Sequence, residues 1–581
     1  MTTQFTKESS ERSNVESIRE RPQAQVLIIG GGINGIGTFR DLALQGVDVI
    51  LVERNDYASG ASAASSHMIH GGIRYLENGE FRLVRESVRE RNGLLKIAPH
   101  YVKPLKTTIP IFSTFSGVLS APLRFVTHKQ GKPKERGAFL IKIGLTLYDA
   151  FSRDGGSVPR HEFSGRRKSL AALPALNSDI KYTATYYDGS LVNPERLALD
   201  VLNDGLATGR NARAANYVEA IGVSDGSVRL RDRESGHEFL VHAEVVVNAS
   251  GPWTDMTNTA LGNGTEYMGG TKGSHIVLDS PELLAACDGR ELFFENDDGR
   301  IVLIYPLNGR VLIGTTDLEA DMNQPAVCTD EEIDYFIGLV AHVFPDIEVA
   351  RSQIVYRFAG VRPLPHHDDT QPGFVSRDYR IVHDSIPGLD QSKVLSLVGG
   401  KWTTFRALGE QLSDEVLRAL GVKRKVSTAR LAIGGGRGFP TTESAERDWI
   451  ARYGADLPPE RARQLLASYG THARAVIDHL AAYSDTLLVG TAAFTAGEID
   501  FMARNELVVH LSDVLLRRTT LAFSGALTGD LVEQIGAILS DALGWSATRL
   551  AEELASVQAE LASSHGIDLT LHPKREGAVA R

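Results

Sequence analysis

The sequence has little cysteine and no long apolar run. Its 581 residues include only two cysteines, Cys287 and Cys328. Two cysteines exclude a disulfide framework and a thiolate metal cluster, and they fit a reducing cytoplasm. No uncharged apolar run reaches the roughly 18 residues that span a bilayer, so any membrane contact is expected to be peripheral. Basic residues are outnumbered by acidic ones, 62 to 72, and the net charge of −10 argues against a general nucleic-acid binder.

The N-terminal segment also lacks an apolar core. Residues 1–23 are polar and charged, which predicts a disordered leader and not a signal peptide. A chain of 581 residues is too long for one ordinary core, so two or three domains are expected.

The first ordered pattern is a strand, a glycine turn, a helix and a second strand. An apolar strand over 25–30 ends in the spacing Gly30-x-Gly32-x-x-Gly35, and a second strand over 47–53 ends at Glu53. The first glycine permits a tight turn, the second lets the backbone approach a pyrophosphate, and the third lets the helix pack closely on the strand. A carboxylate at the end of the second strand can bind ribose hydroxyls. This pattern predicts a dinucleotide site.

The order of the later segments favours FAD over NAD. A long excursion follows the first unit, and apolar strands return only near residues 245 and 395, as in flavoproteins whose nucleotide domain is assembled from separated segments. Alternating residues over 300–306 and 310–316 predict an antiparallel sheet with one covered face. From about Glu443 the spacing becomes helical, and residues 423–440, with the sequence GGGRG, indicate a boundary.

Several motifs resemble one family, the FAD-dependent glycerol-3-phosphate dehydrogenases of the respiratory, quinone-linked type. In chain order they are IIGGGINGIG, SSHMIHGGIRYLE, VVNASGPWTD, KGSHIVL, IGTTD, FAGVRPL, VSRDY, GGKWTTFR and DVLLRRTTLAF. The resemblance implies an α/β fold. A Rossmann-type FAD-binding domain of the glucose/D-amino-acid oxidase kind would be interleaved with an antiparallel-sheet substrate domain over 24–422. A C-terminal α-helical domain would follow over 441–570.

The resemblance also implies which residues line the FAD. The helix start at GGKWTTFR would point backbone N–H groups and Lys401 at the flavin, where negative charge develops on reduction. Ser250 stands where the family more often has threonine, and Asn248 precedes it in the same contact. The expected cofactor-binding residues are Gly30, Gly32, Gly35, Glu53, Ser62, Ser66, His70, Gly71, Gly72, Ala249, Gly251, Gly400, Lys401, Thr403 and Thr404.

The implied substrate is glycerol 3-phosphate, a dianion. Guanidinium groups grip phosphate best, and the substrate-binding residues expected from the matching motifs are Arg74, Tyr75, Arg362 and Arg377. His275 is the leading candidate for the base that deprotonates the C2 hydroxyl, because its ordinary pKa near 6.5 suits that task. Arg362 is the second catalytic candidate, as a phosphate clamp or to polarise the oxygen. The family often has lysine where His67 stands, so His67 is assigned no role, and no metal is expected.

Alternatives remain open for the electron acceptor. The same motifs fit an oxidase that reduces oxygen to hydrogen peroxide. A flavin-binding sensor would instead lack the substrate arginines, which are present. A membrane quinone would require peripheral attachment of a cytoplasmic protein to the cytoplasmic membrane. The basic pair Arg517 and Arg518, or a loop near the flavin, is the candidate docking surface. A homodimer is also compatible with the sequence.

Overall fold

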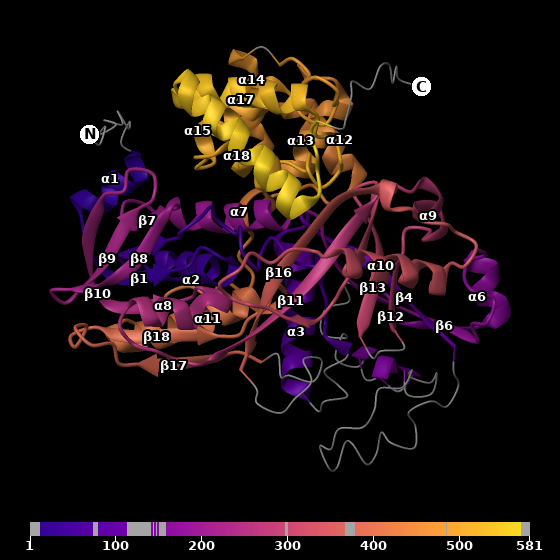
Figure 1. Ribbon diagram of the computed structural model, residues 1–581, viewed down its shortest axis with the longest axis horizontal. Coiled ribbons are helices and arrows are strands. Elements are labelled where there is room, and N and C mark those ends of the chain that lie inside the picture. The colour runs from indigo at the N-terminus through magenta and orange to yellow at the C-terminus, as the bar shows by residue number, and fades with distance from the viewer. Residues whose placement is uncertain are drawn as a thin grey trace.

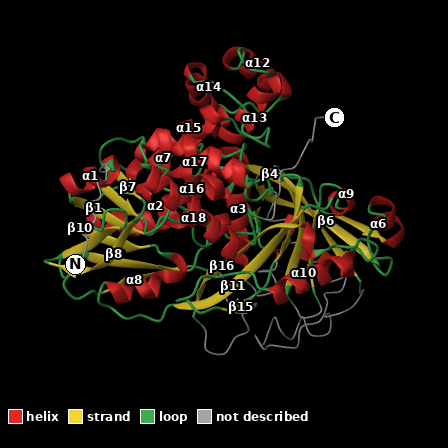
Figure 2. Cartoon of the chain, turned by 45° about the horizontal axis from the view of Figure 1, so that its top comes forward, coloured by secondary structure: helices red, strands yellow, loops and turns green. Residues whose placement is uncertain are grey.

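The computed structural model describes residues 12–73, 80–112, 141–142, 144–146, 148–149, 158–296, 300–366, 378–483 and 485–570. Two β-sheets lie side by side, and a helical region from the C-terminal part of the chain packs on them (Figure 1). Figure 2 shows the same division, with the strands in two groups and most helices gathered above and between them.

The first sheet is built from strands that are far apart in the sequence. Its order is β17-β18-β10-β1-β2-β7, and every neighbouring pair is parallel except β17 with β18. The strands are β1 (Gln23–Ile29), β2 (Val49–Val52), β7 (Ala212–Ala215), β10 (Glu238–Asn248), β17 (Arg380–Asp384) and β18 (Lys393–Val398). This topology confirms the prediction of a sheet assembled from separated segments.

Both faces of this sheet are covered, which explains why its strands are apolar without alternation. Val26 and Ile28 of β1 pack against helices on one face, whereas Leu27 and Ile29 pack against an antiparallel hairpin on the other. The helices are α2 (Ile33–Leu44), α7 (Pro194–Leu206) and α11 (Phe405–Leu420). The hairpin consists of β8 (Val218–Ser224) and β9 (Ser227–Asp232), and α8 (Thr254–Ala260) contacts β8.

A short helix, α1 (Ser13–Glu20), corrects the prediction of a disordered leader up to residue 23. Val15 and Ile18 are buried in the same cluster as Leu27 and Ile50 of the first sheet. Arg12 adds a hydrogen bond of 2.8 Å to the backbone carbonyl of Asn216. Two apolar residues in a charged segment are a weak signal, and the helix is stabilised by the sheet face that it covers. The prediction is therefore wrong from residue 13 onward.

The second sheet is almost wholly antiparallel, as predicted. Its order is β15-β11-β14-β13-β12-β4-β6-β3, β16 pairs with β11 and β5 with β6, and only β12 and β4 are parallel. The long strands are β4 (Val102–Ile111), β6 (Tyr182–Leu191), β11 (Met268–Leu278), β13 (Ile301–Leu307) and β16 (Ile354–Pro365). The shorter strands are β3 (Met68–Ile69), β5 (Glu162–Gly165), β12 (Glu291–Glu295), β14 (Arg310–Gly314) and β15 (Leu318–Glu319).

Helices from this half of the chain pack on the second sheet and at its border with the first. Alternate residues of β14, Val311 and Ile313, are buried together with Phe336 and Val340 of α10. The helices are α3 (Phe81–Ile97), α6 (Arg166–Ala172), α9 (Pro281–Ala286) and α10 (Asp330–Val343). Helix α10 begins with a complete capping box, in which Thr329 and Glu332 satisfy each other's backbone N–H groups.

The helical region has its own apolar core. Several of its helices begin at threonine or serine caps: the side chains of Thr442, Thr495, Thr528 and Ser546 each accept a hydrogen bond from a backbone N–H in the first turn. The elements are α12 (Glu443–Tyr453), α13 (Pro459–Tyr469), α14 (Ala473–Ala482), α15 (Ala496–Asn505), α16 (Leu511–Asp513), the π-helical turn η8 (Val514–Arg518), α17 (Gly529–Leu543) and α18 (Ala547–His565). Among the described residues no helix is both long and apolar enough to cross a membrane.

Buried ion pairs join the helical region to the first sheet. The Asp56 carboxylate is 2.5 Å from Nε of Arg517 and 2.6 Å from a terminal nitrogen of Arg518. Arg517 is also 2.7 Å from Asp513. Burial alone would raise the pKa of Asp56, but the charges of Arg518 and Arg517 outweigh it and hold the pKa below its ordinary value. The suggestion that these two arginines face a membrane is wrong, because both are buried and paired.

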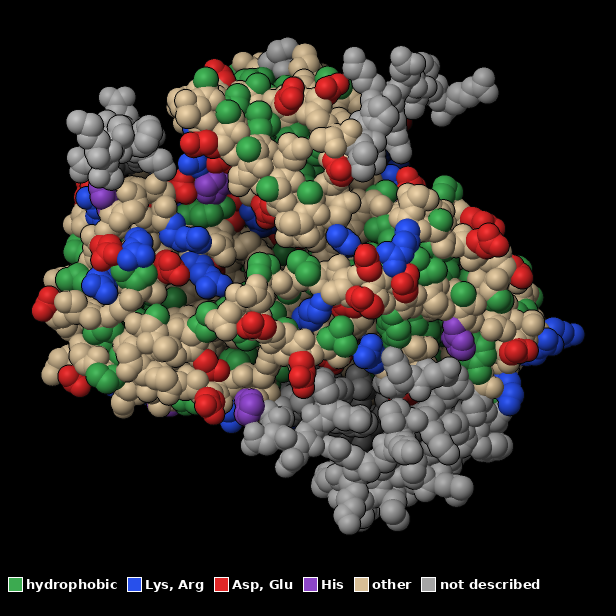
Figure 3. All heavy atoms as spheres, viewed as in Figure 1, with side chains coloured by type: hydrophobic (Ala, Val, Ile, Leu, Met, Phe, Trp, Pro, Cys, Tyr) green, Lys and Arg blue, Asp and Glu red, His purple; other side chains and the backbone are tan. Residues whose placement is uncertain are grey.

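The face of the molecule in Figure 3 does not show a basic patch of the kind that docks on a membrane. Lys and Arg side chains are interspersed there with Asp and Glu over the sheets, and the helical region at the top shows mainly Asp and Glu. Such mixed charge attracts an anionic surface weakly.

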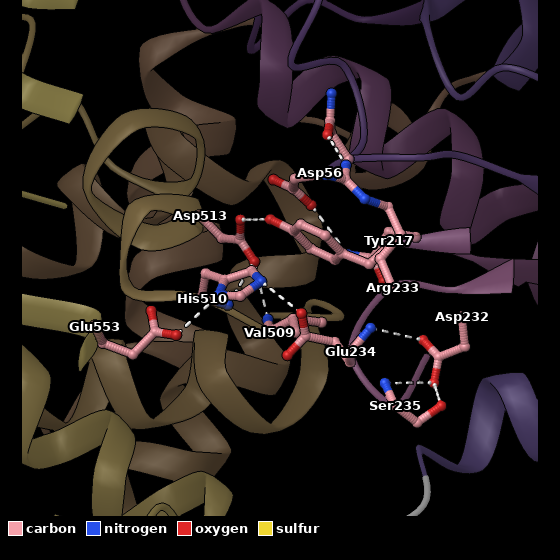
Figure 4. Close-up of polar contacts among 12 residues, drawn as sticks. Asp56, Tyr217, Asp232, Arg233, Glu234, Ser235, Val509, His510, Asp513 and Glu553 are labelled. Atoms are coloured by element: carbon pink, nitrogen blue, oxygen red, sulfur yellow. Dashed lines mark hydrogen bonds and ion pairs between the residues drawn. The ribbon is translucent and has the colours of Figure 1, made fainter. Parts of the chain in front are cut away.

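His510 forms a second polar contact between the same regions (Figure 4). Its Nε2 is 3.1 Å from Glu234, in the turn between β9 and β10, and its Nδ1 is 2.8 Å from Glu553 of α18. Nearby, the Tyr217 hydroxyl donates a hydrogen bond of 2.6 Å to Asp513. Burial lowers the pKa of His510, but the two glutamates outweigh it and raise the pKa to about 9. His510 is therefore a cation at neutral pH.

We predict that Asp56→Ala will destabilise the protein by about 3–5 kcal/mol, because it leaves two buried guanidinium groups without their shared partner. Limited proteolysis should then cut between the first sheet and the helical region, and urea unfolding should begin earlier. Glu443→Ala is the control, since its pair with Arg447 is exposed at 3.8 Å and is worth less than about 1 kcal/mol. Equal stability of the two variants would contradict the role of Asp56.

We predict a pH-dependent contribution from His510. Its folded pKa of about 9 lies above the ordinary 6.5, so its stabilisation is fully present below pH 6.5 and is lost as the pH rises to 9. The melting temperature of the wild type should exceed that of His510→Gln at pH 6, and the difference should shrink by pH 9.5. A difference that stays constant over this range would show that the ion pairs do not form.

Candidate active site

The glycine turn at the end of β1 is shaped by close backbone contacts. Gly30 has φ +115°, and a Cβ there would lie 2.6 Å from the carbonyl oxygen of Ala249. A Cβ on Gly35 would lie 2.0 Å from the carbonyl oxygen of Gly30, so α2 packs on the turn as the spacing predicts. Gly32 differs, since a Cβ there would meet only the Ser62 hydroxyl, at 3.3 Å. The turn is therefore open at Gly32, next to the N-terminus of α2.

Glu53 is fixed directly beside this turn. One carboxylate oxygen accepts a hydrogen bond of 2.7 Å from the N–H of Gly31, and the other accepts one of 2.9 Å from the N–H of Asn55. Burial raises the pKa of Glu53, and these two hydrogen bonds oppose the rise. Each oxygen keeps a lone pair for a further donor. This geometry fits the predicted contact with a ribose.

The segment after β2 links the turn to the rest of the site. The Ser62 hydroxyl accepts a hydrogen bond of 3.0 Å from the N–H of Ile33 at the start of α2. The Ser62 carbonyl accepts one of 3.0 Å from the indole of Trp402. Further along, the Ser66 hydroxyl lies 2.9 Å from Nε2 of His275. Ser62 and Ser66 therefore connect the two regions in which cofactor and substrate contacts were predicted.

The glycine pair that follows is partly explained by packing alone. A Cβ on Gly71 would lie 2.0 Å from the hydroxyl of Tyr148, and the Gly71 N–H donates a hydrogen bond of 2.9 Å to Asp188. Gly72 has φ +76°, a conformation that favours glycine. His70 beside them is half-buried. Buried contacts therefore require Gly71 whether or not it touches a cofactor.

Two further segments complete the predicted cofactor region. Gly400 has φ +125°, and a Cβ there would lie 2.4 Å from the side-chain nitrogen of Asn34 in α2. The side-chain oxygen of Asn34 and the hydroxyl of Thr404 are buried and have no hydrogen-bond partner among the described residues. Unpaired buried polar atoms are costly, so these two indicate contact with a bound polar molecule. The region fits a cofactor with phosphate and heterocyclic polar groups.

The neighbouring residues show how the local backbone is held. Thr403 and Thr404 belong to a 3₁₀ turn, η5 (Trp402–Thr404), that leads into α11. The Lys401 amine donates a hydrogen bond of 2.6 Å to the Ser87 hydroxyl of α3. At the end of β10, the Ser250 hydroxyl donates one of 2.6 Å to Asn248, directly before Gly251.

His275 lies on β11 in an apolar surrounding. Its ring stacks on Phe358 of β16, with 4.8 Å between ring centroids and 11° between planes. Its Nδ1 is buried without a partner among the described residues. Burial, and next the charge of Arg362, hold the pKa of His275 well below 6.5. The imidazole is therefore neutral at pH 7, and its lowered pKa corrects the expectation that His275 keeps an ordinary pKa near 6.5.

Arg362, on β16, is held by several acceptors. One terminal nitrogen is 2.8 Å from the Asp317 carboxylate, and the other donates to the Thr316 carbonyl at 2.7 Å and the Thr315 hydroxyl at 3.0 Å. A Cβ on Gly273 would lie 2.4 Å from the same guanidinium. Asp317, the last residue of the motif IGTTD, was not among the predicted site residues. The carboxylate compensates much of the charge that Arg362 could offer to a substrate.

Some predicted residues cannot be placed in the site. Arg74, Tyr75 and Arg377 lie outside the described residues, so their roles remain predictions. His67 is described: it is buried with φ +55°, and its Nδ1 lies 3.1 Å from the Leu191 carbonyl. Burial lowers the pKa of His67 to about 4, so it is uncharged, unlike the lysine of the family pattern.

Comparison with known proteins defines the class. The family of FAD dependent oxidoreductases matches residues 25–395, and the C-terminal domain of alpha-glycerophosphate oxidase matches residues 426–550. The chain belongs to the FAD-dependent oxidoreductase family and is an enzyme that uses FAD.

Within that class, the chain is similar over most of its length to glycerol-3-phosphate dehydrogenases. The chain is 33% identical over 549 residues to a glycerol-3-phosphate dehydrogenase of Synechocystis sp., covering 90% of this chain and 93% of the relative. It is 30% identical to a D-erythritol 1-phosphate dehydrogenase of Brucella abortus, covering 86% and 95%. A solved glycerol-3-phosphate dehydrogenase of Bacillus halodurans, complexed with FAD, shares the fold, with TM-score 0.72, 24% identity and coverage of 96% and 99%.

We predict that Gly32→Val will prevent FAD binding without breaking the turn, because the added side chain extends into the open space at the N-terminus of α2. The purified variant should lack flavin absorbance while its far-UV circular dichroism matches the wild type. Gly35→Val is the contrasting variant, since its side chain collides with the backbone and should destabilise the fold itself. Full yellow colour in Gly32→Val would contradict the proposed position of the pyrophosphate.

Proposed function

We propose that the protein oxidises sn-glycerol 3-phosphate to dihydroxyacetone phosphate and passes the electrons to a membrane quinone. Its similarity to glycerol-3-phosphate dehydrogenases over nine tenths of the chain is the observation that carries this proposal. The position of His275, beside Ser66 and near Arg362, supports it, since oxidation of an alcohol needs a base at the hydroxyl.

His275 acts as the base. The C2 hydroxyl of the substrate gives its proton to the imidazole, which is neutral at pH 7, while FAD, when bound, supplies the acceptor for the hydride. Ser66 holds Nε2 of His275 at 2.9 Å, and Phe358 holds the plane of the ring. The base is therefore oriented by the same segment that contacts the glycine turn.

Arg362 orients the substrate oxygen or its phosphate, and Asp317 keeps the guanidinium in place. Arg74, Tyr75 and Arg377 are proposed to complete phosphate binding, as their motifs imply. Gly400, Lys401, Thr403 and Thr404 are proposed to contact the flavin ring. Backbone donors at the start of a helix stabilise the negative charge of a reduced flavin.

The proposed acceptor implies contact with a bilayer. A quinone is held in the membrane, so the protein would attach reversibly to its cytoplasmic face. The buried Arg517 and Arg518 are excluded as the attachment surface. The alternative is an oxidase that reduces oxygen, which the relatedness to alpha-glycerophosphate oxidase in the C-terminal region keeps open.

The proposal can be tested by anaerobic titration of the purified enzyme. Glycerol 3-phosphate should bleach the flavin faster than D-erythritol 1-phosphate at equal concentration. A short-chain quinone should then restore the colour faster than oxygen does. Faster bleaching by D-erythritol 1-phosphate would show that this compound, and not glycerol 3-phosphate, is the preferred substrate. Reoxidation by oxygen as fast as by the quinone would favour the oxidase.

We predict that His275 and Arg362 differ in their kinetic effects. His275→Asn should lower kcat by about 100- to 10,000-fold, because the base is lost. Arg362→Ala should lower kcat/KM by about 10- to 100-fold, corresponding to roughly 1.5–3 kcal/mol for a charge-assisted hydrogen bond. Both variants should retain FAD. Arg351→Ala is the control, because Arg351 is exposed and pairs only with Asp330 and Asp334 among the described residues. Unchanged kinetics in either variant would contradict the role proposed for that residue.

A further inference from the structure

A cavity of about 220 Å³ lies where the helical region meets both sheets. Its lining comes from segments far apart in the chain: the loop 59–64, the first turn of α7, β16, the end of η8 with residues 519–523, and α18. In Figure 1, α18 lies at the lower edge of the helical region, and it contacts β16. The cavity is therefore closed only when the helical region is docked.

The cavity is separate from the glycine turn. In the loop 59–64 the residues Gly60, Ala63 and Ala64 line the cavity, whereas the Ser62 hydroxyl bonds the N–H of Ile33 at the start of α2. One layer of small residues thus separates the cavity from the predicted cofactor region. Phe358 likewise separates the cavity from His275, since it lines the cavity and also stacks on the His275 ring.

The arginines of the cavity wall are already compensated. Arg517 and Arg518 pair with Asp56, and Arg196 pairs with Glu506 at 2.8 Å. An anion entering the cavity would have to compete with these carboxylates for the guanidinium groups.

The other titratable residues of the wall are mostly uncharged. Burial lowers the pKa values of His67 and His565 to about 4. Burial also raises the pKa of Glu195, in the first turn of α7, to about 8. Glu560 on α18 is a further acid, half-buried at the wall. At pH 7 Glu195 is therefore a carboxylic acid that can donate a hydrogen bond.

Aromatic rings form much of the remaining wall. Tyr356 lies 5.7 Å from Phe358 and 6.2 Å from Phe523, centroid to centroid, and Phe494 also faces the cavity. Burial raises the pKa of the Tyr356 hydroxyl, which keeps it a donor. Polar side chains such as Asn193, Asn308 and Gln464 also line the cavity. Aromatic rings together with polar groups suit a small ring molecule that carries polar atoms.

We propose that this cavity binds an uncharged ring molecule that carries oxygen, held against the aromatic side chains with Glu195 and Tyr356 as hydrogen-bond donors. Two sources share this chemistry: the headgroup of a quinone and a free phenol. The quinone case rests on the proposed function, and it would make the cavity the acceptor site. A quinone takes up two electrons and two protons to form a quinol, which are those released when the C2 alcohol becomes a ketone.

The test uses the holoenzyme and isothermal titration with two probes, 2,3-dimethoxy-5-methyl-1,4-benzoquinone and p-cresol. Leu516→Trp should fill the cavity and weaken binding at least tenfold, because Leu516 lines it. Leu543→Trp is the matched control, since Leu543 is a half-buried leucine of the same region outside the cavity lining, and it should bind like the wild type. Glu195→Ala should weaken binding several-fold with flavin absorbance unchanged.

The outcomes separate the two sources. Binding of the benzoquinone that Leu516→Trp abolishes supports an acceptor site. Binding of p-cresol alone supports the cavity as a site and excludes the quinone there. Binding of neither probe, or equal binding to wild type and Leu516→Trp, overturns the proposal. Bleaching of the flavin by glycerol 3-phosphate needs no acceptor, so a failure of the proposed function would be seen independently.

Discussion

The placement of three charges in the interior, Asp56 between Arg517 and Arg518, is the constraint on which the arrangement of the two regions depends. The acid and the arginines are more than 460 residues apart in the chain. An uncompensated buried charge costs several kcal/mol, so Asp56 and Arg518 each need the other region, whereas Arg517 also pairs with Asp513 of its own region. Their pairing sets η8 and α18 against α7 and β16. The cavity between the two regions depends on the same contact, and so does Phe358, which lines the cavity and stacks on His275.

The glycine turn was predicted from the sequence because its pattern spans only one strand, one turn and the start of one helix. Its contact with the cofactor stays a prediction. Gly35 packs against the Gly30 carbonyl within this unit, whereas Gly30 meets Ala249 of the segment after β10, and the position of Gly32 is open. The parallel sheet followed from unbroken apolar strands and their wide separation. The leader was misjudged for the opposite reason. Val15 and Ile18 become apolar contacts only when a sheet face made from residues 27–52 and 215–246 is present.

The interaction partners of the catalytic residues could be identified only from the structure. His275 and Arg362 were singled out by resemblance, but the contacts that determine their chemistry come from elsewhere. Ser66 precedes His275 by 209 positions, and Asp317 comes from a turn after β14. Burial, which no spacing rule measures, makes His275 neutral. Arg517 and Arg518 show the same limit, because a basic pair on an apolar helix face reads equally well as a surface feature or as an internal ion pair.

The segmented first sheet has a consequence for biosynthesis. Strand β1 has β10 as one neighbour, and β10 has β18, so the centre of the sheet is completed only after residue 398 has been translated. Until then β10 exposes an unpaired edge of apolar residues to other nascent chains. Ribosomes that stall or terminate within the second sheet would release chains that aggregate and cannot retain the dinucleotide. Truncations from the C-terminal end therefore have two different effects. Loss of the C-terminal helices leaves the buried Asp56 without its arginine partners, whereas loss of β18 leaves the first sheet incomplete.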